Sequence, residues 1–251
     1  MKNDRETNEF HLLHAPIVEA VIAIKFAERL PENALSGLEE CARRIQEIYP
    51  IKDVIRSQQF QVMLGVSTQS NVETPKPEGF FCKMSNDHRV VHLKLDSFGF
   101  SELAPYSSWN SFFPEARRLW EEHQRTIGTR PVDSWSIRYI NRISWPEGAQ
   151  REEYMRVYPH IPDGIPQDMV GCFMRLQIPV QRPTRGLFTQ QLFTAPPLKS
   201  GMVSVVLDHE FSYSALGLTE SALWTQIEQS REVKNDFFRA SLTEKALETF
   251  K

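Results

Sequence analysis

The sequence has few cysteines and no pattern that would join them. Its 251 residues include three, Cys41, Cys82 and Cys172, which form no CxxC pair and leave one thiol over. That arrangement fits neither a disulfide framework nor a zinc site, so we expect reduced thiols that serve as small core residues. Glycine is also sparse at 11 residues, none clustered, and neither GxxxxGK[ST] nor GxSxG occurs. A phosphate-binding P-loop and a hydrolase nucleophile elbow are therefore not indicated.

The sequence also lacks a net positive charge and long apolar runs. The formal net charge of -3 gives no basic footprint for a nucleic-acid backbone, so nucleic acid is an unlikely partner. The first residues, MKNDRETNEFHLL, are polar and contain no apolar core of a secretory signal. No stretch approaches the ~18 apolar residues of a membrane span. The sequence predicts a cytoplasmic protein without a membrane partner, a metal or a cofactor.

What the sequence does have is alternation of period two. In WSIRYINRISWP (135–146), Trp135, Ile137, Tyr139, Asn141, Ile143 and Trp145 share one side and arginines lie on the other, which is typical of a half-buried strand. Similar runs predict strands over 16–26, 57–65, 79–85, 89–100, 132–145, 168–180, 186–193 and 201–213. Apolar residues at helical spacing predict helices over 31–50, 108–128 and 218–242, with a weaker candidate over 151–162.

These elements occur in the order β-α-β-β-β-α twice, over 16–128 and 129–251. Duplication of one unit would explain the order, and so would coincidence, because the halves share no obvious residue identity. The fold class we expect is α+β, as one domain over 1–251. An extended antiparallel sheet would be built from two similar halves, with helices mainly on one face because each layer must bury its apolar side.

A polar open face of the sheet is the first candidate site. Arg138, Arg142, Arg175 and Gln177 all project onto it if the helices cover the Trp135 side. Guanidinium groups bind carboxylate or phosphate in bidentate fashion, so these residues are our candidate ligand-binding set for a small anion. A solvated face with weak cross-strand pairs and a protein-binding face remain open alternatives. We also predict a structural ion pair between Glu19 and Arg138, which occupy matching positions on the first strand of each half.

Candidate catalytic and metal-binding groups are weaker. Strand alternation separates His209 from Asp208 and Glu210, so DHE (208–210) indicates a surface carboxylate pair rather than acid–base chemistry. His88 and His92 have a helical metal spacing but lie in a strand and turn context. Aromatic residues concentrate in APYSSWNSFFPEARRLW, which we interpret as core and helix-entry packing. A base-stacking platform is the alternative, although it would need basic surroundings.

Four segments together resemble a known family. APIVEAVIAIKF, PYSSWNSFFPEARRLW, WSIRYINRI and REVKNDFFRASLTEKALETF occur in the same order as in a sporadically distributed, functionally uncharacterised bacterial family of about this length, marked by P-[IV]-x-E-A, Y-x-S-W and R-Y-I-N-R-I. That family often has a histidine near the start of the last segment, where this chain has Arg231. The resemblance implies a bacterial, cytoplasmic domain and assigns no activity, ligand or catalytic residue.

Two classes of function follow from these observations. The first is a non-enzymatic interaction or accessory protein of the bacterial cytoplasm, acting through a protein partner or self-association, because no catalytic constellation or cofactor motif is recognisable. The alternative is a small-molecule or nucleotide-binding protein, conceivably an enzyme, that uses the open polar sheet face for an anionic ligand.

Overall fold

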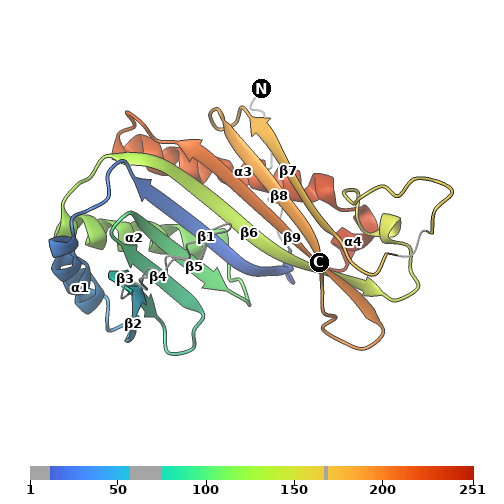
Figure 1. Ribbon diagram of the computed structural model, residues 1–251, viewed down its shortest axis with the longest axis horizontal. Helices are drawn as coiled ribbons and strands as arrows, with labels where there is room; N and C mark the ends of the chain where they lie inside the picture. The colour runs from blue at the N-terminus through green and yellow to red at the C-terminus, as the bar shows by residue number, and fades with distance from the viewer. Residues whose placement is uncertain (1–11, 57–74, 167–168) are drawn as a thin grey trace, which may run out of the picture.

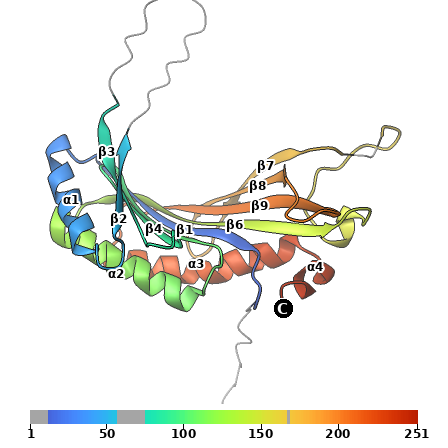
Figure 2. The ribbon, with the colours of Figure 1, turned by 90° about the horizontal axis from the view of Figure 1, so that it is seen from below.

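The fold is a single twisted sheet with its helices on one face, as the computed structural model shows for residues 12–56, 75–166 and 169–251 (Figure 1, Figure 2). The elements are β1 Ile17–Phe26, η1 Glu32–Ala34, α1 Leu35–Arg44, β2 Ile51–Arg56, β3 Pro77–Lys83, β4 Arg89–Lys94, β5 Ser97–Leu103, α2 Trp109–Ile127, β6 Val132–Pro146, η2 Arg151–Glu153, β7 Phe173–Val180, β8 Gly186–Ala195, β9 Met202–Ser214, α3 Glu220–Ser241 and α4 Glu244–Glu248. The expected α+β class with an antiparallel sheet is confirmed.

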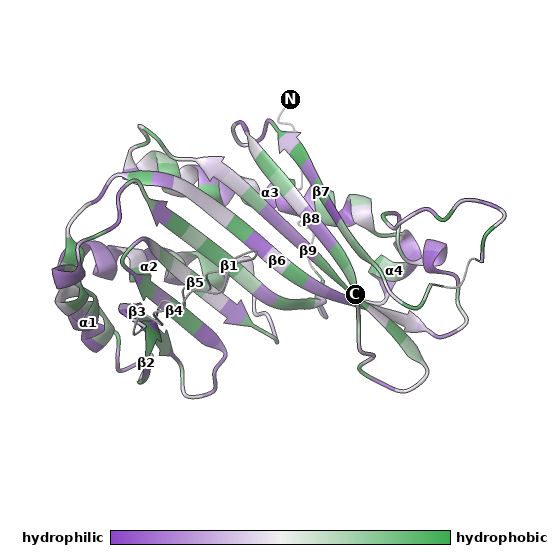
Figure 3. Ribbon diagram, viewed as in Figure 1, coloured by the Kyte–Doolittle hydropathy of each residue, from purple (hydrophilic) through white to green (hydrophobic). Residues whose placement is uncertain are grey.

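The described strands form one sheet in the order β2-β3-β4-β5-β1-β6-β9-β8-β7, and every neighbouring pair is antiparallel. Hydrophobic and hydrophilic residues alternate along the long central strands β6 and β9 (Figure 3). On β6 all six residues of the predicted apolar face, from Trp135 to Trp145, are buried, while Arg138 and Arg142 stay partly exposed. The period-two pattern therefore predicted the buried face of the central strand correctly.

α2 and α3 lie within two residues of the predicted ranges 108–128 and 218–242, whereas the helix predicted over 31–50 is shorter and forms only η1 and α1, which ends at Arg44. Ser108 caps α2 by accepting a hydrogen bond from the Ser111 amide, and Gly128 ends it with a φ of 82°. Thr219 caps α3 in the same way through the Ala222 amide. Between helices and sheet lies a core of large aromatic side chains that are almost fully buried, namely Phe98, Phe100, Phe112, Trp120, Trp135, Phe188, Phe211 and Trp224. The interpretation of the aromatic segment as packing is confirmed for Phe112 and Trp120.

Three other elements differ from the prediction. The run 89–100 is two strands, β4 and β5, joined by a turn at Leu95 and Asp96. The apolar residues stand at odd-numbered positions before this turn and at even-numbered positions after it, so the change in alternation indicates where the turn lies. Within 151–162 only the short η2 forms. β2 at Ile51–Arg56 was not predicted, since the first helix was expected to end at residue 50 and the next strand to begin at residue 57. The strand expected over 57–65 lies outside the described residues.

The strand order is mirrored about the central pair. β1 and β6 lie side by side and antiparallel, and β5, β4 and β3 follow one another outward from β1 as β9, β8 and β7 do from β6. The mirror is incomplete, because among the described residues β2 and α1 have no counterparts in the second half. An internal duplication thus remains a prediction.

Candidate functional site

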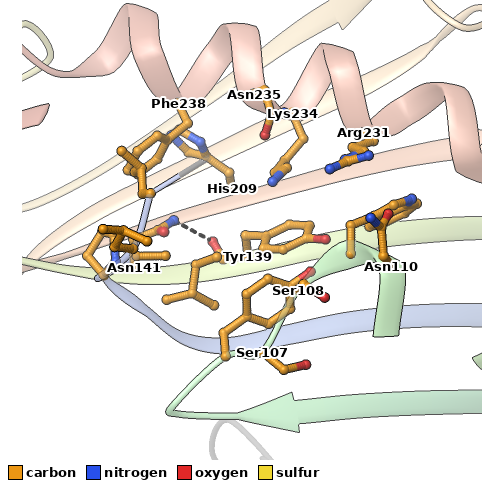
Figure 4. A pocket seen from close by; sticks show the side chains of 17 residues that line it. Ser107, Ser108, Asn110, Tyr139, Asn141, His209, Arg231, Lys234, Asn235 and Phe238 are labelled. Atoms are coloured by element: carbon orange, nitrogen blue, oxygen red, sulfur yellow. Dashed lines mark hydrogen bonds between the residues drawn. The ribbon is translucent and has the colours of Figure 1, made fainter. Parts of the chain in front are cut away.

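A cavity of about 370 Å³ lies between α3 and the helix-covered face of the sheet. Four parts of the chain enclose it: residues 12–17 before and at the start of β1, residues 106–110 at the entry to α2, the middle of β6 and β9, and one side of α3 (Figure 4). The volume is in the range of small-molecule pockets. This cavity is on the opposite side of the sheet from the site that the sequence suggested.

Lysine occurs in α3 at a position where the helix should be apolar. Six residues of α3 follow one another at a spacing of three or four, and all of them except the lysine are buried: Leu223, Ile227, Ser230, Lys234, Phe238 and Ser241. Arg231, Lys234, Asn235 and Phe238 line the cavity from the same side of the helix. Figure 4 shows both cationic side chains directed from α3 toward the sheet.

The amine of Lys234 lies over an aromatic ring. Its Nζ is 4.2 Å from the centroid of the Tyr139 ring, a cation–π geometry. Burial, followed by the positive charge of Arg231, lowers the pKa of Lys234 to about 7. The residue as a whole is partly exposed. Near pH 7 the neutral and charged forms of this amine therefore coexist.

The sheet supplies the floor of the cavity through residues of one face. Tyr139 and His209 are directly opposite in the β6–β9 register, and both are about 1% exposed. His209 Nε2 lies 3.1 Å from Gln190 Oε1, and His209 Nδ1 has no hydrogen-bond partner among the described residues. Burial and the charge of Lys234 lower the pKa of His209 to about 3, so its ring is neutral. Burial likewise raises the pKa of the Tyr139 hydroxyl.

A buried carboxylate holds the loop that forms the third wall. Glu102 is fully buried, and its Oε1 accepts hydrogen bonds from both the backbone N and Oγ of Ser107 at 2.6 Å each. Its Oε2 accepts from Arg89 Nε at 2.7 Å, and Arg89 also reaches Ser111 in the first turn of α2. This network fixes the loop, so α2 begins beside the cavity with Ser108, Trp109 and Asn110 on its lining.

The charges of the cavity wall are one-sided. Among the described residues that line it, Arg231 and Lys234 are cationic and none is a carboxylate. The N-terminus of α2 adds a partial positive charge from the helix dipole. Hydroxyl and amide groups of Ser107, Asn110 and Asn235 can also hydrogen-bond a ligand. The arrangement suits a small organic anion with an apolar or aromatic part.

The predicted ion pair has a different acidic partner. Arg138 binds Asp208 of β9 in bidentate fashion, with Nε to Oδ1 at 2.8 Å and Nη2 to Oδ2 at 2.6 Å. Glu19 is opposite Ile140 in the register, whereas Arg138 is opposite Val21. Glu19 therefore lies diagonally from Arg138 and raises its pKa only as a lesser contributor after Asp208 and Glu210. The carboxylate that hydrogen-bonds Arg138 is thus that of Asp208 and not that of Glu19. The interpretation of Asp208 as a surface residue was wrong, since it is 2% exposed.

The other predicted ligand-binding residues are not gathered into one site. Arg142 donates a hydrogen bond from Nη2 to the carbonyl of Pro196. Arg175 and Gln177 are exposed on the edge strand β7, which β9 and β8 separate from β6. At about 4.8 Å per strand, roughly 14 Å lies between β6 and β7. The sequence placed the anion site on the open face, while Tyr106, Trp109 and Tyr139, which line the cavity, were assigned to packing.

Cysteines and metal-ligand types form no centre in the described part of the chain. Cys41 and Cys82 are buried and Cys172 is partly exposed. No group of three or more histidine, cysteine, aspartate or glutamate side chains in these ranges is arranged to hold a metal ion. Within the same ranges, no helix has the length and apolarity needed to cross a membrane.

Comparison with known proteins gives no family assignment. No protein-family model matches the chain, and no curated protein sequence matches it either. The resemblance described above therefore remains a prediction, and the function must be argued from the cavity itself.

Proposed function

We propose that this protein binds a small organic anion in the cavity beneath α3. The observation that carries the proposal is a lysine on the buried stripe of α3, whose amine meets an aromatic ring at 4.2 Å inside a cavity lined by a second cation and, in the described ranges, by no carboxylate. This is the ligand-binding alternative inferred from the sequence, with the site on the helix side of the sheet.

Energetics favour an anionic occupant. A charged amine on an apolar stripe is desolvated, and in the ligand-free protein Arg231 adds a like charge nearby. A carboxylate or phosphate in the cavity would face both cations and would restore the charged form of Lys234. Binding of an anion is thus coupled to proton uptake by this amine. An apolar substitution of Lys234 should stabilise the empty protein and lower its affinity for the ligand.

Thermal unfolding with pyruvate, lactate, benzoate or inorganic phosphate tests the proposal. At about 100 times Kd a ligand stabilises by roughly 2.7 kcal/mol, which raises Tm by roughly 5 °C in a chain of this size. Lys234→Met should raise the Tm of the empty protein and abolish this shift. Arg239→Met is the matched control, because Arg239 is an exposed cation of the same helix paired with Asp236. An identical anion response in Lys234→Met and in the wild type would contradict the proposal.

A second candidate is self-association through β7, which keeps open the interaction function expected from the sequence. β7 is an edge strand whose apolar side chains are exposed on both faces, with Phe173 at 67%, Leu176 at 38% and Ile178 at 43%. Unpaired edge strands readily pair with another chain. The occupant we propose is the β7 of a second copy, antiparallel and centred on Leu176. That register places Arg175 opposite Gln177 and avoids opposing like charges.

A further inference from the structure

The amine of Lys234 is placed as a nucleophile as well as a cation. It points into the cavity, it contacts the Tyr139 ring, and it forms no ion pair with any carboxylate in the described ranges. Many exposed lysines and arginines of this chain are paired, for example Lys245 with Glu153. An amine at the wall of a ligand-sized cavity that has no carboxylate partner in the described ranges has an accessible lone pair whenever it is neutral.

We propose that Lys234 forms a reversible imine with a small 2-oxo acid bound in this cavity, an inference that rests on the proposed anion-binding function. The Nζ lone pair attacks the carbonyl carbon, and the C=O π electron pair moves onto the oxygen. A proton then passes from the nitrogen to this oxygen, which becomes a hydroxyl group. The resulting carbinolamine then loses that hydroxyl as water. The carbonyl oxygen leaves with the two hydrogens of the amine, a C=N bond replaces the C=O bond, and no oxidant or reductant is needed.

The spacing of the two cations suits this ligand class. Arg231 and Lys234 are three residues apart on one face of α3, a separation that brings their Cβ atoms to about 5–6 Å. A 2-oxo acid carries its carboxylate on the carbon next to the carbonyl. Arg231 can therefore hold the carboxylate while Lys234 attacks its neighbour.

The surroundings suit both the free amine and its product. In the empty cavity, burial and Arg231 lower the amine's pKa to about 7, so an appreciable share is neutral at physiological pH. The carboxylate of a bound 2-oxo acid raises this pKa again, and the imine forms from the neutral share that remains. Once protonated, the imine is a cation that stays over the face of Tyr139. The neutral His209 ring and the protonated Tyr139 hydroxyl add no negative charge that would hold the amine as ammonium.

Reductive trapping tests the proposal. The wild-type protein is incubated with glyoxylate or pyruvate and sodium cyanoborohydride at pH 7, and intact mass and peptide mapping then locate the adduct. We expect the adduct on Lys234 to form on the order of 10-fold or more faster than the adduct on Lys245, whose pKa is raised by its bond to Glu153. Lys234→Arg keeps the cation and should lose the adduct.

The same samples separate this inference from the anion-binding proposal. Lactate has the carboxylate without the carbonyl, so it should raise Tm and leave no adduct. If lactate and pyruvate raise Tm while cyanoborohydride labels Lys234 no faster than Lys245, the imine is overturned and anion binding stands. If neither acid changes Tm and Lys234 is not labelled preferentially by glyoxylate or pyruvate, both proposals are overturned for this ligand class.

Discussion

Single side chains on the open sheet face show how burial decides the value of an ion pair. Asp208 accepts both bonds of Arg138 and a third from Gln191 Nε2 at 3.3 Å, and its side chain is 3% exposed. The side chain of Arg138 is 39% exposed. The two partners therefore differ in what happens when one is removed. A stranded Arg138 can turn to water, while a stranded Asp208 cannot.

We predict that Arg138→Met is more destabilising than Asp208→Asn. Removing the partner of a buried charge costs about 3–5 kcal/mol, so we expect about 3 kcal/mol for Arg138→Met and about 1–2 kcal/mol for Asp208→Asn. Glu19→Gln, a neutralised carboxylate on the same face, is the control and should cost less than about 0.5 kcal/mol. Urea midpoints of the three variants give the comparison. Equal costs for Arg138→Met and Asp208→Asn would refute the role of burial.

At the scale of elements, local patterns predicted most strands and helices and missed the site. The alternation of β6 specified its buried face because a strand has only two faces. The caps Ser108 and Thr219 fixed the starts of α2 and α3. A cavity, by contrast, depends on how far α3 stands from the sheet, and no local pattern encodes that distance. One signal was available, since Lys234 interrupts the apolar stripe of α3.

The choice of ion-pair partner was also beyond local patterns. Arg138 has Glu19, Asp208 and Glu210 around it, on two neighbouring strands. Strand order and register decide which carboxylate meets the guanidinium, and both are properties of the complete sheet. From the sequence alone, Glu19 was predicted as the partner of Arg138 because the two residues occupy matching positions in the two halves. Matching positions contain no information about strand register.

At the scale of elements, we predict that the edge strand β7 forms a dimer contact. If a second copy adds its own β7, the molar mass measured by light scattering should rise with protein concentration toward that of a dimer. Leu176→Lys places a charge in the centre of the pairing region and should keep the protein monomeric. Leu198→Lys is the control, because Leu198 is an exposed apolar residue outside any strand. A wild-type mass that stays monomeric at every concentration would exclude this contact.

For the whole molecule, neutral histidines buried in the fold link its stability to pH. Burial lowers the pKa of His123 to about 4 and, with the charge of Lys234, that of His209 to about 3. Both residues are about 1% exposed. The ordinary histidine pKa is about 6.5, so the unfolded chain binds more protons than the folded protein between that value and about 4. Their contribution to stability is complete above pH 6.5 and is lost as the pH falls toward 4.

Burial also lowers the pKa of His92 to about 4, so three histidines take up a proton on unfolding. The free energy of unfolding should therefore fall by about 4 kcal/mol per pH unit through this window. His123 stacks on Trp120 and Phe26, so His123→Phe keeps an aromatic ring at that position. We predict that this variant loses about a third of the pH slope measured from urea midpoints between pH 4.5 and 6. A change in packing would shift its curve at every pH, whereas loss of the proton uptake changes the slope. His160→Gln, at an exposed residue, should leave the slope as in the wild type, and an unchanged slope in His123→Phe would show that the folded protein already binds this proton.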